Sequence, residues 1–277
     1  MALTLDSIGY AYGSGTSFVS AALEGVSLSV APGELVMVLG ATGSGKSTLL
    51  RVAAGLLQPS TGVASIDGQA HTRASVRGNV GLVFQDAESQ LFAETLVQDV
   101  AFGPANLGLS RGDALAQAAE ALAKVGLDPA VYGQRSPFHL SGGEARRAAI
   151  AGVLAMRPRY LLLDEPTAGL DASGRSAVRA IVRAERERCG VVVVSHSAEE
   201  FLGEADRVIM LASGRTAFDD SARSLVQAPE AFAAAGLEAP DVLLLQLCAR
   251  DRGVELGPLT LDPVEAAGSI ARAGGWA

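Results

Sequence analysis

The stretch Gly40–Thr48 constrains this chain more than any other, because it has the form of a phosphate-binding loop. It follows the pattern Gly, four residues, Gly, Lys, Ser, in which glycines let backbone N–H groups turn toward a triphosphate. The apolar run before it, residues 34–39, predicts a buried strand, and residues 48–54 predict a helix. The loop residues are Gly40, Ala41, Thr42, Gly43, Ser44, Gly45, Lys46, Ser47 and Thr48.

Two side chains of this loop have separate expected roles. Lys46 is placed to reach the β- and γ-phosphates, and Ser47 is placed to ligate Mg²⁺. The helix N-terminus adds partial positive charge. A glycine-rich turn that binds nothing is the alternative, but it needs neither the lysine nor both flanking elements. The sequence therefore predicts a nucleoside triphosphate with Mg²⁺.

Composition limits the other classes of function. The 277 residues contain 22 Lys plus Arg against 30 Asp plus Glu, a net charge of −8, which argues against broad nucleic-acid binding. Two cysteines, Cys189 and Cys248, fit a reducing cytosol. The first residues lack the pattern of a signal peptide, and no apolar run approaches the ~20 residues that span a bilayer. A mean hydropathy above zero indicates a partner-covered surface or simply a high alanine content.

Polar residues follow several apolar runs that predict strands of a parallel sheet. Gln85 follows residues 79–84, Asp164 and Glu165 end the run 160–165, and His196 follows residues 191–195. Ligands of open α/β sheets bind at the carboxyl edge. Asp164 is therefore expected to hold Mg²⁺ and Glu165 to orient or deprotonate a water. Gln85 is placed to reach Mg²⁺ or that water, and His196 to sense the γ-phosphate.

The segment Leu140–Glu144 begins a predicted helix. Ser141 with Glu144 three residues later forms a capping box, the ordinary start of a helix. However, Gly142 and Gly143 each weaken a first helical turn by up to roughly 1 kcal/mol relative to alanine. A close approach of an anion to the bare amides explains both glycines.

The remaining segments give weaker expectations. Residues 1–39 alternate as half-buried antiparallel strands, and Tyr12, or else Tyr10, either stacks on an adenine ring or is purely structural. Residues 86–109 are expected to be loop-rich, and residues 113–125 helical. Beyond about residue 220, Val242–Leu247 and Leu256–Leu261 are expected to be elements of a small packing unit.

Taken in order, these motifs resemble the ATP-binding subunit of ABC transporters over residues 1 to about 218. The resemblance implies an α/β fold: a P-loop NTPase (RecA-like) core, an antiparallel β subdomain, a helical signature subdomain at about 86–158 and a C-terminal segment 221–277. It also implies roles for individual residues. The matching positions are Tyr12 for the adenine-stacking aromatic, near Phe18; Gln85 for the Q-loop; Ser141, Gly142, Gly143 and Glu144 for the signature; Asp164 and Glu165 for the Mg²⁺ aspartate and catalytic glutamate; Asp171 for the D-loop; and His196 for the switch histidine. The usual signature ends in Gln rather than Glu, a difference expected to have little effect.

A narrower match is to energy-coupling factor (ECF) transporters, the vitamin and cobalt/nickel uptake systems of prokaryotes. Gln90–Leu109, Ile150–Met156 and the segment after Gly236 are similar to that family. One departure is Asp86-Ala87-Glu88, where relatives often carry Asn-Pro. This departure lies where a membrane subunit is expected to dock.

The resemblance implies a peripheral ATPase on the cytoplasmic face of the membrane, which hydrolyses ATP with Mg²⁺. Its expected partners are a second ATPase subunit, identical or different, a transmembrane coupling subunit and a substrate-binding membrane subunit, with no nucleic acid. The signature of one ATPase would cap ATP on the P-loop of the other, and residues 221–277 would lie at the dimer interface. The alternatives are the ATPase of another ABC transporter class and a non-transport ABC ATPase.

Overall fold

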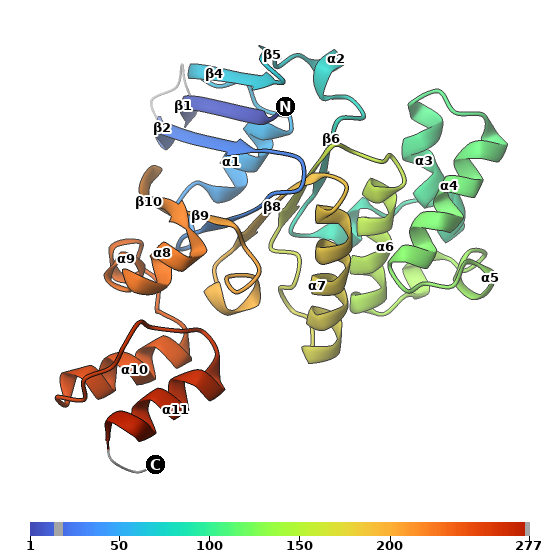
Figure 1. Cartoon of the computed structure of the whole chain (residues 1–277). Helices are drawn as coiled ribbons and strands as arrows, with labels where there is room; N and C mark the ends of the chain where they lie inside the picture. The colour runs from blue at the N-terminus through green and yellow to red at the C-terminus, as the bar shows by residue number, and fades with distance from the viewer. Residues whose placement is uncertain (14–18, 275–277) are drawn as a thin grey trace.

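The structure is a computed structural model that describes residues 1–13 and 19–274. Two sheets lie one over the other, with a helical region at one side and a pair of helices at the C-terminal end (Figure 1). The strands are β1 (Leu3–Tyr12), β2 (Ser20–Val30), β3 (Leu35–Leu39), β4 (Thr61–Ile66), β5 (Gln69–Ala70), β6 (Val80–Val83), β7 (Tyr160–Asp164), β8 (Gly190–Ser195), β9 (Arg207–Ala212) and β10 (Arg215–Ser221).

The helices connect and cover these sheets. They are α1 (Lys46–Ala53), α2 (Arg73–Val76), α3 (Leu96–Asn106), α4 (Arg111–Lys124), α5 (Pro129–Tyr132), α6 (Gly142–Leu154), α7 (Ala172–Arg186), α8 (Ala222–Gln227), α9 (Glu230–Ala234), α10 (Asp241–Asp251) and α11 (Pro263–Ala273). Short 3₁₀ turns are η1 (Ala87–Gln90), η2 (Pro137–His139) and η3 (Ala198–Glu200). In the described residues, no helix is both long and apolar enough to cross a membrane.

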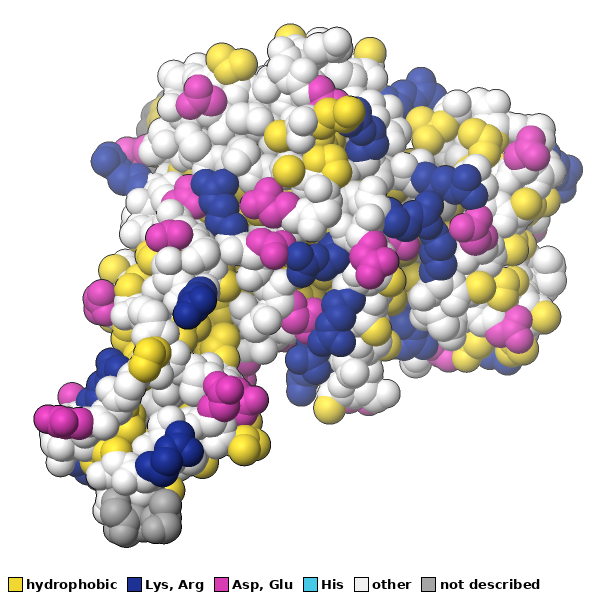
Figure 2. Space-filling model, viewed as in Figure 1, with side chains coloured by type: hydrophobic (Ala, Val, Ile, Leu, Met, Phe, Trp, Pro, Cys, Tyr) yellow, Lys and Arg dark blue, Asp and Glu magenta, His cyan; other side chains and the backbone are white. Residues whose placement is uncertain are grey.

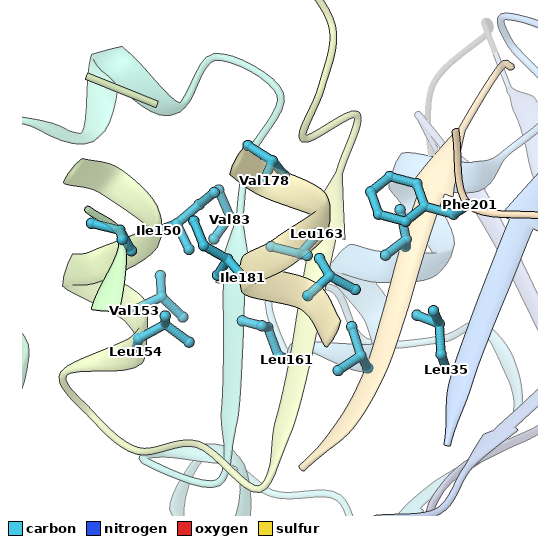
Figure 3. Close-up of a cluster of buried hydrophobic side chains, with 14 of the residues drawn as sticks. Leu35, Val83, Ile150, Val153, Leu154, Leu161, Leu163, Val178, Ile181 and Phe201 are labelled. Atoms are coloured by element: carbon cyan, nitrogen blue, oxygen red, sulfur yellow. The ribbon is translucent and has the colours of Figure 1, made fainter. Parts of the chain in front are cut away.

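The larger sheet has the order β10-β9-β3-β8-β7-β6, with parallel pairing from β9 to β6. Every residue of β3, β7 and β8 is buried, because both faces of this sheet are covered. Leu161 and Leu163 of β7 face the helices α6 and α7, where Val153 and Val178 pack in the same cluster (Figure 3). The carboxyl ends of the parallel strands therefore meet at one edge, as the sequence predicts.

The second sheet is antiparallel and has the order β2-β1-β4-β5. Leu5 pairs with Leu28 of β2 on one side and with Ala64 of β4 on the other. Its inner side chains join those of α1 and the near face of the parallel sheet in one buried cluster. This arrangement confirms the antiparallel expectation for β1 and β2, whereas residues 35–39 form β3 of the parallel sheet. The antiparallel sheet also supports the loop that follows β3.

The expectation of a loop-rich stretch at residues 86–109 was wrong in its second half, where α3 forms. Gly103 and Pro104 oppose a helix by propensity. Tertiary packing overrides it, because Leu96 and Val100 are fully buried against α4 and α6. A side chain at Gly103 would lie 2.7 Å from Cγ of Met156, so glycine allows α3 and the end of α6 to approach closely.

Of the two elements expected in the C-terminal segment, one is present and the other prediction was wrong. Val242–Leu247 lies within α10, but Leu256–Leu261 is neither helix nor strand. Gln246, which is 1% exposed, donates to Thr260 O (2.7 Å) and accepts from Thr260 N (3.1 Å). Gln227 holds Leu259 in the same two-bond manner. The side-chain amides therefore form the hydrogen bonds with the Leu259–Thr260 backbone that a neighbouring strand would otherwise form. Helix α11, capped by Asp262, packs beside α10.

Candidate nucleotide site

The loop between β3 and α1 has a backbone that only glycine permits at two positions. A side chain at Gly45, where φ is +105°, would lie 2.5 Å from Ala22 O. A side chain at Gly40 would lie 2.5 Å from Leu211 O. The loop therefore packs tightly against β2 and β9 at these two positions. Its outer residues, Thr42 and Gly43, are exposed and open toward solvent.

The Lys46 side chain curls back along this loop. Its Nζ donates to Gly40 O (2.6 Å) and Ala41 O (3.0 Å), and the residue is 7% exposed. Burial lowers the pKa of Lys46, while the charges of Glu165 and Asp164 act in the opposite direction. The loop carbonyls thus hold the ammonium group within the field of both carboxylates.

Asp164 ends β7 beside this loop and is 5% exposed. The Ser47 hydroxyl lies near the Asp164 carboxylate, yet the Oδ1 atom of Asp164 is buried without a hydrogen-bond partner. Burial raises the pKa of Asp164, and the interaction with Ser47 only partly offsets this. A buried carboxylate oxygen with no partner beside a serine hydroxyl suits Mg²⁺, which takes one or two protein oxygens together with phosphate oxygens.

Glu165 follows Asp164 with a left-handed backbone, at φ +48°. A hydrogen bond from Glu165 N to Val194 O (3.0 Å) holds this rare conformation, which is unfavourable for a residue with a side chain. The Oε2 atom of Glu165 lies 2.8 Å from Nδ1 of His196. The imidazole itself is 63% exposed, so its other nitrogen faces outward.

Gln85 lies two residues beyond the end of β6, and Glu165 two residues beyond Leu163, the partner of Val83 in β7. The Gln85 side chain is exposed. Its backbone oxygen accepts a hydrogen bond from Nη1 of Arg146 on α6 (2.5 Å). Sequence reasoning missed Arg146; the available signal was an arginine inside the alanine-rich face of a predicted helix.

The signature residues form a second hollow, separate from the loop 40–48. It has a volume of about 490 Å³ and is lined by Ser141, Gly142, Gly143, Glu144, Arg147, Gly169, Leu170, Asp171, Ser173 and Gly174. Ser141 caps α6, and Asp171 caps α7 by accepting from Gly174 N (2.7 Å). The capping box predicted at Ser141 and Glu144 is present.

Glu144 has more contacts than a capping box requires. Its carboxylate accepts from Ser141 N, Ser141 Oγ and the Tyr132 hydroxyl, each at 2.8 Å. These hydrogen bonds, that from Ser141 N first, lower the pKa of Glu144. Tyr132 is a second residue that sequence reasoning missed.

Tyr12 lies beside the start of α1. Its hydroxyl is 3.1 Å from Oγ1 of Thr48, and its ring packs edge-on against Tyr10 with centroids 4.9 Å apart. The residue is 39% exposed. Tyr12 thus has both a structural contact and a free surface, whereas Phe18 lies outside the described residues.

The structure therefore gathers Lys46, Ser47, Asp164, Glu165 and His196 at one sheet edge and places Ser141–Glu144 with Asp171 elsewhere. This is the layout of an ATP-binding cassette. Consistent with it, the sequence profile described as ABC transporter matches residues 23–168. A curated relative, the energy-coupling factor transporter ATP-binding protein EcfA2 of Symbiobacterium thermophilum, is 43% identical over 96% of this chain and 95% of its own length. The chain belongs to the energy-coupling factor group of ABC transporter ATPases.

Other matches agree with this family. The EcfA2 protein of Streptococcus pyogenes serotype M28 is 39% identical over 96% of this chain and 98% of that protein. The solved structure of cbiO1 from Clostridium perfringens, part of the ABC transporter complex cbiONQ, has a TM-score of 0.73 and 31% identity over 88% of this chain and 98% of that one. The dimeric ABC transporter cassette MJ0796 has a TM-score of 0.71 and 27% identity over 80% of this chain and 99% of that one.

The family membership confirms three predictions made from the sequence: the P-loop NTPase fold, the ABC-type ATPase activity and the ECF type. The ABC profile ends at residue 168, but the ECF relatives align over nearly the whole chain. The C-terminal segment is therefore part of what this group shares.

Proposed function

We propose that this chain couples ATP binding and hydrolysis to uptake of a vitamin or transition-metal ion through separate membrane subunits. The observation that carries the proposal is that the residues of the ATP site lie on two separate surfaces of the chain. The loop 40–48 with Glu165 and the hollow at Ser141–Gly143 are separate surfaces of one chain. Two chains arranged head to tail would bring the signature of each against ATP on the P-loop of the other. MJ0796, solved as a dimer, supports such an assembly.

Each residue of the site has a defined task in this proposal. Lys46 would turn from the loop carbonyls to the β- and γ-phosphates, and Ser47 with Asp164 would hold Mg²⁺. When bound, Mg²⁺ neutralises phosphate charge and orients the nucleotide. Glu165 would orient and deprotonate the attacking water, because its carboxylate lies at the same edge as the phosphate loop.

The residues around the γ-phosphate would detect its presence. His196 would hydrogen-bond the γ-phosphate while Nδ1 stays with Glu165. Gln85 would reach the metal or the water from the neighbouring strand end. In the partner subunit the Ser141 hydroxyl and the amides of Gly142 and Gly143 would bind the same phosphate, and Asp171 would set the position of that surface.

A membrane subunit has a suitable docking surface between α3 and α6. An apolar hollow of about 430 Å³ lies between the start of β6, η1, α3 and α6. At its rim, Phe92 and Phe102 are 57% and 51% exposed and stack edge-to-face at 4.9 Å. Buried Asp99 fixes this rim, since its Oδ2 accepts from Phe92 N and Ala93 N at 2.7 Å. A coupling helix of a transmembrane subunit is the proposed occupant.

This docking gives the protein a peripheral position on the cytoplasmic face of the membrane. The solute would bind a third, substrate-binding membrane subunit. Nucleic acid is not expected as a partner, and Figure 2 shows Lys and Arg interspersed with Asp and Glu over the viewed face. Residues 221–277 would add contact to the ATPase dimer. Residues 1–220 would form the ABC cassette, with its helical subdomain at about 86–158.

Copurification from detergent-solubilised membranes tests the transport function. The tagged protein should recover a small polytopic membrane subunit. Phe92→Ser should lose that subunit but keep ATP affinity, because the rim lies away from the phosphate loop. Val63→Ser, which removes an exposed apolar side chain from β4, is the control and should retain the membrane subunit. Recovery of ribosomes or nucleic acid in place of a membrane protein would refute the proposal.

A further inference from the structure

Arg146 is a buried cation with no task in the nucleotide site described above. It lies on α6, five residues after Ser141, and is 6% exposed. The residues three and four positions later on the same face of the helix, Ala149 and Ile150, are core residues. Burying a guanidinium group among apolar side chains is unfavourable unless hydrogen bonds replace its lost hydration.

The hydrogen bonds of Arg146 reach two loops of the nucleotide site. Nη1 donates to Gln85 O at 2.5 Å, and Nη2 donates to Ala168 O at 3.4 Å, three residues after Glu165. The Nε atom is buried without a partner. The guanidinium also forms an ion pair with Glu88, whose Oε1 atom lies 3.7 Å from Nη2. The Glu88 side chain is 44% exposed.

These contacts tie three segments to one side chain. The first is the loop after β6, the second is the turn after β7, and the third is the helix that begins with the signature. Glu88 lies in η1, which contributes Gln90 to the apolar hollow. An apolar residue of similar size would fill the same space but would release both carbonyls.

We propose that Arg146 is a positioning residue that holds the Gln85 backbone, and so its side chain, in register with α6 and with the turn after Glu165. The proposal rests on the proposed function, because Gln85 has to act in the hydrolytic step. Glu88 of η1 forms an ion pair with the Arg146 guanidinium, and η1 also borders the hollow proposed for the membrane subunit. A force on η1 would therefore reach the Gln85 carbonyl through one rigid, planar group.

The kinetic consequence is a change in turnover without a change in ATP affinity. In the purified transporter complex, Arg146→Met should lower kcat for ATP about tenfold to a hundredfold, as expected when a reacting group is misplaced. KM for ATP should stay within about twofold, because Lys46 and Ser47 are untouched. Arg146→Lys should recover part of the loss. Arg157→Met, which removes an exposed arginine paired with Glu120 just after α6, is the control and should leave both constants unchanged.

A double-mutant cycle with Gln85→Ala separates positioning from general stabilisation. If Arg146 acts through Gln85, Arg146→Met should have little further effect in the Gln85→Ala background. Multiplicative losses, or a loss in KM alone, would overturn the proposal. If Arg146→Met does not fold, the cycle with Arg146→Lys decides in the same way. Absence of ATP hydrolysis by the unmodified complex would instead count against the proposed function.

Discussion

His196 Nδ1 lies 2.8 Å from Glu165 Oε2, across the carboxyl ends of the neighbouring strands β8 and β7. Glu165 is 8% exposed and held by its backbone bond to Val194, whereas His196 projects into solvent. The buried carboxylate is thus linked directly to an exposed imidazole. In the proposed mechanism, a γ-phosphate that contacted the imidazole would alter the hydrogen bonding of Glu165 and would so connect phosphate detection to the activation of water.

Replacement of the proposed base should separate binding from hydrolysis. Glu165→Gln keeps the shape of the side chain but removes its basicity, so ATP turnover should fall by about 10²–10⁴. Titration with a fluorescent ATP analogue should give unchanged affinity. Lys46→Ala is the contrasting variant and should weaken binding itself. Near-normal turnover by Glu165→Gln in the purified complex would remove Glu165 from the role of base.

The buried carboxylate of Asp164, whose Oδ1 atom has no hydrogen-bond partner, should destabilise the protein in the absence of nucleotide and Mg²⁺. Burial raises its pKa above the usual 3.8, so the ionised form is disfavoured at neutral pH, and this penalty is lost as the pH falls through the raised pKa. Asp164→Asn should therefore raise the free energy of unfolding at neutral pH, by on the order of 1 kcal/mol. The difference from the unmodified protein should shrink as the pH approaches 3.8. Urea unfolding across this pH range measures it.

Asp67 provides a control of opposite sign. Although burial raises its pKa, hydrogen bonds from Arg159 and Tyr160 lower it overall. Its contribution to stability is present above the unfolded pKa and is lost as the pH falls, so Asp67→Asn should be destabilising at neutral pH.

Addition of Mg²⁺ and ATP should stabilise the unmodified protein more than the Asp164→Asn variant. Equal stabilisation of both would exclude Asp164 from the metal site.

Two substitutions distinguish adenine stacking from a structural role for Tyr12. Tyr12→Phe keeps the ring and removes the hydroxyl contact with Thr48, so ATP affinity should stay the same. Tyr12→Ala removes the ring and should weaken affinity about tenfold, within the ~1–3 kcal/mol typical of base stacking. Tyr10→Ala is the matched comparison. Equal affinity for Tyr12→Ala and the unmodified protein would leave Tyr12 with its structural contact alone.

Replacement of the signature serine, Ser141, should affect both protein stability and ATP-driven dimerisation, and the two effects can be measured separately. Ser141→Ala removes the helix cap and should lower the free energy of unfolding by about 1 kcal/mol. Ser110→Ala removes an equivalent cap from α4 and should be destabilising to a similar extent. The Glu165→Gln protein should dimerise when ATP is added, as measured by size-exclusion chromatography. Adding Ser141→Ala to this variant should abolish dimerisation, and adding Ser110→Ala should not. If both keep it, Ser141 acts as a cap only.

Local patterns were sufficient for the elements with a strong physical signature. The apolar run Tyr160–Leu163, which precedes Asp164, predicted an interior strand, and the glycine spacing in Gly40–Gly45 predicted a tight loop before a helix. They failed where packing opposed propensity. Helix α3 contains Gly103 and Pro104 and forms because Leu96 and Val100 are buried against α4 and α6. Leu259–Thr260 is held by the amides of Gln227 and Gln246, which come from α8 and α10.

The sequence by itself determined the chemistry of this protein, because residue type and order along the chain define the P-loop, the carboxylate pair and the signature. Only the tertiary structure decided how these groups relate in space. Strand order places Glu165 against His196, and burial leaves Oδ1 of Asp164 without a partner. The contact between Arg146 and Gln85 joins residues 61 positions apart. No local pattern encodes such a contact, because it depends on how α6 packs against the end of β6.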